Sequence, residues 1–168
     1  MVAAITGLPG SGKSTFAKAL ASRINGRHIS SDAMRFKLAL YGQYDENAKL
    51  AVYDLMLKDM EDALMAGDNV VLDATFYKNS IRERFKETAR KFKTPFFLIK
   101  IEAAEAVIKE RISKRREDSE ADFQIYQLIK SEYEPITDNY ITLKSDQASL
   151  DMLVGQAIDF IEYSDGTL

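Results

Sequence analysis

The sequence contains no cysteine and only one histidine, His28, among its 168 residues. A chain without cysteine has no disulfide framework and no thiolate nucleophile. It also lacks the sets of His and Cys ligands that hold zinc in proteins. Any metal ion bound by this protein must therefore have oxygen ligands.

Long apolar runs are also missing, although 46% of the residues are hydrophobic. No stretch approaches the roughly 18 apolar residues that a membrane-spanning helix needs, so we expect no membrane insertion. The N-terminus lacks a basic leader and runs straight into a glycine-rich motif, so we expect no secretory signal and a cytoplasmic location.

The formal net charge of -3 argues against a general nucleic-acid coat protein. It leaves room for a local basic patch around a small anionic substrate, and nothing indicates an obligate protein partner.

The length fits a single domain over residues 1–168, without internal repeats or linkers. Three short β-rich runs show little polar alternation, which is typical of parallel strands buried on both faces. These runs are Val2 to Thr6, Val70 to Asp73 and Phe96 to Ile101. Weaker strands are expected at Arg27 to Ser30 and Tyr140 to Leu143.

Apolar residues at helical spacing fill the segments between these runs, so strands and helices alternate. The helices are expected around residues 14–24, 48–64, 81–92 and 150–161, the third behind a Ser80/Glu83 capping box and the last behind Asp146. We interpret the basic residues of the third helix as a solvated face: Arg82, Arg84, Lys86, Arg90, Lys91 and Lys93. Alternation of this kind predicts a three-layer α/β/α sandwich with a five-stranded parallel sheet and ligands at the carboxyl ends of its strands.

A phosphate-binding motif follows the first strand directly. The pattern G-x-x-x-x-G-K-[ST] is satisfied by Gly7, Leu8, Pro9, Gly10, Ser11, Gly12, Lys13, Ser14 and Thr15. Its glycines let backbone N–H groups turn toward phosphate oxygens at the positive end of the next helix. We expect Lys13 to bind the β- and γ-phosphates of ATP and the Ser14 hydroxyl to bind Mg²⁺.

Three further blocks follow this motif, and together they carry a family resemblance. The blocks are GLPGSGKST, HISSDAMR, VVLDATF and ERISKRRED, in that order. With them the sequence resembles small P-loop kinases, which have the P-loop NTPase fold. It is most similar to polynucleotide 5′-hydroxyl kinases and their relatives, including zeta toxins and small-metabolite kinases, over about residues 1–135. The resemblance implies transfer of the γ-phosphoryl group of ATP to a hydroxyl acceptor.

Two residues after the second strand are candidates for the acceptor side. The resemblance implies that Asp32 is a general base for the attacking hydroxyl, which a carboxylate at a strand's carboxyl end can orient. The alternative is that Asp32 caps a helix beginning at Ala33, although Ser31 can do so instead. Arg35 lies within a turn of Asp32, and in polynucleotide kinases an arginine at this place holds an acceptor phosphate. A solvated helix arginine is the alternative there.

Asp73 ends a buried apolar strand and is therefore expected to project toward the cleft beside the phosphate-binding motif. It can either position Mg²⁺ through water or orient the acceptor, and the sequence leaves both roles open beside that of a turn-forming aspartate. Thr75 can add a hydroxyl group there. His28 has no carboxylate or serine at a pairing distance in the sequence, so we interpret it as structural.

A basic run at about residues 111–122 has the layout of a lid. In the resembling kinases, lid arginines at R-x-x-x-R spacing close over the nucleotide and neutralise the transferring phosphoryl group, which maps onto Arg111 and Arg115. Arg116 is an adjacent candidate. The alternative is a solvated helix end whose cations complement the helix dipole.

The phosphoryl acceptor is left open between a polynucleotide 5′ end and a small metabolite. A second class of function is a P-loop nucleotide switch without an alcohol acceptor, but the chain has no N-K-x-D motif and no D-x-x-G after the Val70 strand. A third class is a binding module that holds nucleotide without turnover.

Overall fold

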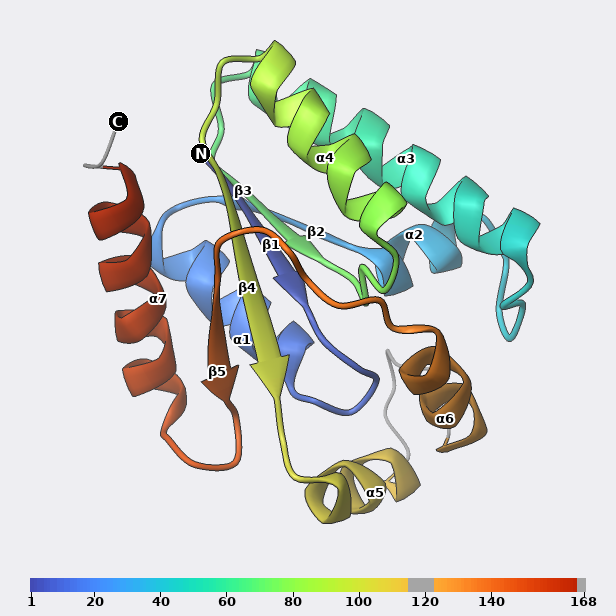
Figure 1. Ribbon diagram of the computed structural model, residues 1–168. Coiled ribbons are helices and arrows are strands. Elements are labelled where there is room, and N and C mark those ends of the chain that lie inside the picture. The colour runs from blue at the N-terminus through green and yellow to red at the C-terminus, as the bar shows by residue number, and fades with distance from the viewer. Residues whose placement is uncertain (115–122, 166–168) are drawn as a thin grey trace.

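Five parallel strands form one sheet in the order β2-β3-β1-β4-β5, which confirms the predicted five-stranded parallel sheet. The computed structural model describes residues 1–114 and 123–165 (Figure 1). The strands are β1 (Val2–Thr6), β2 (Arg27–Ser30), β3 (Val70–Asp73), β4 (Phe96–Glu102) and β5 (Tyr140–Lys144). The helices are α1 (Lys13–Arg23), α2 (Ser31–Lys37), α3 (Glu46–Met65), α4 (Asn79–Lys91), α5 (Glu105–Ser113), α6 (Phe123–Glu132) and α7 (Leu150–Asp165).

Helices cover both faces of the sheet, as a parallel sheet requires. On one face α1 and α7 pack against the strands, and on the other α3 and α4 do so (Figure 1). Successive residues of β1 alternate between these two cores: Ala3 and Ile5 face the first, while Val2 and Ala4 face the second. Helices α5 and α6 lie beyond the carboxyl ends of the strands, where the ligand is expected (Figure 1). Within the described ranges, every helix falls short of the length or apolar character that crossing a bilayer demands.

Two helix starts differ from the predicted caps. Lys78 is the N-cap of α4 and makes no side-chain cap, while the Asn79 N–H donates to Glu134 Oε2 at 2.6 Å. At α7, Ser149 Oγ accepts from the Met152 N–H, whereas Asp146 accepts from the Ala104 N–H at 2.9 Å. The capping box at Ser80 and the Asp146 cap were therefore wrong. At α4 a carboxylate far along the chain satisfies the N–H group, and at α7 Ser149 is the local acceptor while Asp146 binds Ala104 instead.

We predicted that Arg82 belongs to a solvated face of α4, but Arg82 is only 3% exposed. Its guanidinium donates to the Phe76 carbonyl oxygen at 2.5 Å and to the carbonyls of Glu134 and Pro135 at 3.0 and 3.1 Å. It also lies 5.7 Å from the centre of the Tyr133 ring. Arg82 thereby joins the loop after β3 to the segment after α6.

We expect Arg82→Ala to lower the free energy of unfolding by about 3 kcal/mol, because it leaves buried carbonyl oxygens without donors. Arg84, which is exposed on the same helix and pairs with Asp54, provides the control, and Arg84→Ala is expected to cost less than about 1 kcal/mol. Denaturant unfolding measures both changes. Equal losses in the two variants would show that the buried guanidinium has no structural role.

Candidate active site

The glycine-rich loop between β1 and α1 is held close to neighbouring backbone. A Cβ atom added at Gly7 would lie 2.4 Å from the Ile101 carbonyl oxygen. Gly12, the N-cap of α1, has a φ of 94°, and a Cβ there would lie 3.0 Å from Ser145 Oγ. Both positions therefore require glycine. The resulting backbone path leaves the N–H groups at the start of α1 available to bind an anion.

Arg111 lies beside this loop. Its Nη1 donates to Ser145 Oγ at 2.8 Å and to the Ser11 carbonyl oxygen at 3.2 Å, and Ser145 Oγ donates to the same carbonyl at 2.5 Å. Arg111 therefore contacts the loop itself and does not behave as a solvated helix end. Arg115, Arg116 and the rest of the predicted lid up to residue 122 lie outside the described residues.

A pocket that the loop residues Pro9 and Lys13 help to line brings together residues that are distant in sequence. Lys13, Asp32, Arg35 and Thr75 all line it. Ser30 Oγ accepts from the Ala33 N–H at 3.2 Å, so Ser30 caps α2 and the capping roles considered for Asp32 and Ser31 were wrong. Asp32 lies in the first turn of α2, just after β2 ends at Ser30, and lines the same pocket as the lysine of the phosphate-binding motif.

Arg35 is buried in this pocket and is only 7% exposed, so the alternative of a solvated helix arginine was wrong. Its Nη1 donates to the Gln43 carbonyl oxygen, and its guanidinium lies 4.4 Å from the centre of the Tyr44 ring. The ion pairs between the described residues include none that involves Arg35. A buried guanidinium without a carboxylate partner is costly, which favours an anionic ligand nearby.

Asp73 is 2% exposed, and its Oδ1 finds no hydrogen-bond partner within the described ranges. Its Oδ2 lies 3.4 Å from His28 Nε2, because β2 and β3 pair with Ser30 opposite Asp73. His28 thus has the carboxylate neighbour that the sequence did not reveal. A buried carboxylate oxygen without a partner is compatible with a role toward a hydrated cation.

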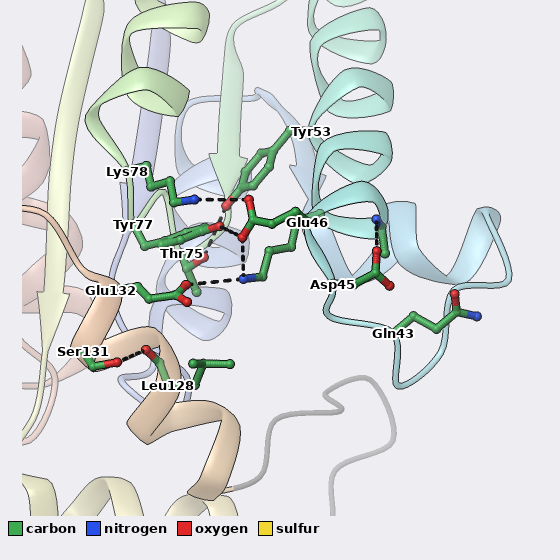
Figure 2. Close-up of polar contacts among 12 residues, drawn as sticks. Gln43, Asp45, Glu46, Tyr53, Thr75, Tyr77, Lys78, Leu128, Ser131 and Glu132 are labelled. Carbon is green, nitrogen blue, oxygen red and sulfur yellow. Dashed lines mark hydrogen bonds and ion pairs between the residues drawn. The ribbon is translucent and has the colours of Figure 1, made fainter.

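Thr75 belongs to a hydrogen-bond network at the pocket wall (Figure 2). Its hydroxyl lies 3.2 Å from the Tyr53 hydroxyl, and its carbonyl oxygen accepts from Thr6 Oγ1 at 2.6 Å. Burial raises the pKa of Tyr53 to about 12, so this hydroxyl stays protonated at neutral pH. Thr75 is therefore fixed between β1 and α3.

Most of the chain matches a known family. The model of the AAA_33 family, described as an AAA domain, matches residues 2–136. This chain belongs to the AAA_33 family. The AAA_33 chain is 29% identical to the thymidylate kinase of Leptospira borgpetersenii serovar Hardjo-bovis (strain L550), over 77% of this chain and 78% of that protein.

Two solved structures share the fold of the AAA_33 protein. A sugar kinase from Janibacter sp. HTCC2649 superposes with a TM-score of 0.76 at 19% identity, over 96% of this chain and 94% of that one. The Mycobacterium tuberculosis APS kinase in complex with AMPPNP and APS gives a TM-score of 0.73 at 18% identity, over 96% of both chains. The predicted P-loop kinase fold is confirmed.

Lys49, Tyr53 and Tyr77 also line the Asp32 pocket, and sequence reasoning did not select them. A signal for Lys49 existed in the sequence. It lies four residues before Tyr53 and seven before Met56, on the stripe of α3 that faces the core. A lysine on a buried stripe is unusual enough to mark a site.

We expect Gly12→Ala in the AAA_33 protein to weaken ATP binding by about tenfold or more, because the added methyl group displaces the loop from Ser145 and removes phosphate hydrogen bonds. Gly67→Ala is the matched control, since Gly67 also has a positive φ of 81° but faces open space. It is expected to cost about 1 kcal/mol of stability and to leave binding unchanged. Calorimetric titration with ATP measures the affinity of both variants. Equal affinities would contradict the role of the Gly12 loop in binding the phosphates of ATP.

Proposed function

We propose that this AAA_33 protein is an ATP-dependent kinase that uses Mg²⁺ and transfers the γ-phosphoryl group to a hydroxyl acceptor. The observation that carries the proposal is that Lys13 and Asp32 line the same pocket. We extend the proposal to one kinase unit over residues 1–168 with a lid at about 111–122, in the cytoplasm, on the sequence patterns given above. The sugar kinase and APS kinase that share the fold support this class of reaction.

The chemistry follows from the placement of charge. The acceptor hydroxyl gives its proton to the Asp32 carboxylate while its oxygen bonds to the γ-phosphorus. The bond from that phosphorus to the β–γ bridging oxygen breaks, and ADP leaves with the electron pair. Lys13 and the N–H groups at the start of α1 stabilise the negative charge that develops.

Two further sets of residues support this step. Arg111, beside the loop, adds positive charge at the phosphates, and Arg115 is proposed to do the same. Ser14 and the unpartnered oxygen of Asp73 would hold the Mg²⁺ site, Asp73 through water. When bound, the cation supplies neutralising charge to the phosphate oxygens.

The test is transfer of label from γ-labelled ATP in the presence of Mg²⁺, with EDTA as the metal-free control. Acceptors are offered in separate reactions: 5′-hydroxyl oligonucleotides, and pooled nucleosides, sugars and other small alcohols. Label in any acceptor, lost with EDTA, supports the kinase. Release of labelled phosphate without any labelled acceptor would favour the nucleotide switch instead.

We expect Asp32→Asn to lower kcat by about 10²- to 10⁴-fold, because the amide cannot accept the hydroxyl proton. The KM for ATP should change by less than about twofold, since Asp32 faces the acceptor. Asp68→Asn is the control, because Asp68 pairs with Arg27 on the surface and lies outside the pocket. Steady-state kinetics measures both, and an unchanged kcat in Asp32→Asn would remove Asp32 from the reaction.

A further inference from the structure

Lys49 is a buried cation in the pocket that also holds Asp32. It comes from the second turn of α3, is 6% exposed, and lines the pocket with Lys13 and Arg35. Its ammonium lies 4.9 Å from the centre of the Tyr77 ring. Nothing in the proposed transfer step uses this charge.

The carboxylates next to Lys49 hold it loosely. Lys49 Nζ lies 3.3 Å from Glu46 Oε1 and 3.4 Å from Glu132 Oε2, whereas charged N–H···O contacts are usually about 2.7–2.9 Å long. Glu46 is shared with Lys78, whose Nζ is 3.1 Å from the other oxygen (Figure 2). Both carboxylates are more exposed than the lysine, so water competes for them.

The Lys49 side chain nevertheless stays charged at neutral pH. Burial lowers the pKa of Lys49, but the neighbouring tyrosine and the two carboxylates raise it by more, so the pKa lies above its ordinary value. A buried ammonium of this kind has N–H groups that can bind an anion at the pocket.

The charges that line the pocket are unbalanced on the acceptor side. Lys13 belongs to the phosphate-binding loop, so the other charged side chains among the described lining residues are the cations of Arg35 and Lys49 and the carboxylate of Asp32. Arg35 has no carboxylate partner among the described residues, and those of Lys49 lie at long distances. An acceptor that carries negative charge would restore the balance.

The walls of the pocket limit the size of its ligand. Ile125 and Ile129 of α6 line it opposite the Tyr53 and Tyr77 rings of the core. Figure 2 shows α6 beside this site, with Glu132 directed toward the ammonium of Lys49. A helix over the pocket suits a small molecule better than a polymer end.

We propose that the acceptor is a small molecule that carries a carboxylate or phosphate group besides its hydroxyl group, and that Lys49 binds this anionic group. The hydroxyl faces Asp32, and the anionic group takes the place of Glu132 beside the ammonium. This inference rests on the proposed kinase function, whose acceptor it specifies. It makes Lys49 a determinant of substrate class.

The test begins with acceptor pools matched in carbon skeleton. One pool holds small alcohols with a carboxylate or phosphate, such as glycerate and glycerol 3-phosphate, and the other holds their uncharged counterparts, such as glycerol. A 5′-hydroxyl hexanucleotide is the third arm. Label from γ-labelled ATP in the anionic pool supports the proposal, and the carboxylate and phosphate members are then separated to identify the group. Label only in the uncharged pool or only in the hexanucleotide overturns it.

Variants then test the role of Lys49. We expect Lys49→Gln to raise the KM of the anionic acceptor by about 10- to 100-fold, with the KM of ATP unchanged, because one charge-assisted hydrogen bond is lost. Lys49→Arg should restore most of the affinity. Lys78→Gln is the matched control, because Lys78 shares Glu46 but does not line the pocket, and it should leave both constants unchanged.

Calorimetry separates this proposal from the kinase assignment, because binding needs no turnover. Asp68→Asn, the surface control, should bind the anionic acceptor as the unmodified protein does, and Lys49→Gln should bind it at least about tenfold more weakly. Equal affinity of the unmodified protein and Lys49→Gln would overturn the proposal even if transfer occurs. Absence of transfer with a retained Lys49-dependent affinity would overturn only the kinase function.

Discussion

The site depends on the pairing of β1 with β3 on one side and β4 on the other. Ile5 lies opposite Asp73 and Thr6 opposite Lys100, so the carboxyl ends of the three strands lie at one level. Pairing of β2 with β3 brings Ser30 to the same level. Because all four strands run in one direction, the phosphate-binding loop, the start of α2 with Asp32 and the end of β3 meet at one edge of the sheet. A register shift of one residue would turn Asp73 to the opposite face.

A second set of contacts fixes α6 relative to that edge. The Thr6 hydroxyl lies 2.7 Å from the Tyr133 hydroxyl, and the Glu134 N–H donates to the Tyr77 carbonyl oxygen at 2.8 Å. Arg82 joins the same segment to the loop after β3. The segment directly after α6 is therefore hydrogen-bonded to β1 and to the loop after β3. These hydrogen bonds hold α6 beside the pocket, which Ile125 and Ile129 line.

The sequence predicts most of the sheet and the phosphate-binding loop, but less of the acceptor side. The bounds of β1, β2 and β3 match the prediction, since buried strands and the glycine motif are signals carried by neighbouring residues. The roles of Arg82 and His28 could not be predicted, because their partners lie on other elements. Lys49 carried a local signal, namely a charge on an apolar helix stripe. Its carboxylate on α6 is 83 residues away in the chain and gave no such signal.

The nucleotide side and the proposed acceptor side of the site present positive charge through different groups. On the nucleotide side, backbone N–H groups and the Gly12 cap present positive charge that needs no counterion, because helix dipoles remain partly solvated. On the acceptor side, the charges are those of buried side chains, and burial of an ion is costly without a partner. Arg35 reduces that cost by lying on the Tyr44 ring, and Lys49 reduces it through the exposed Glu46 and the partly exposed Glu132. These two carboxylates help to keep the ammonium protonated. In the acceptor binding that we propose, a charged acceptor would exchange one of these ion pairs for another, so that the buried charge would stay compensated.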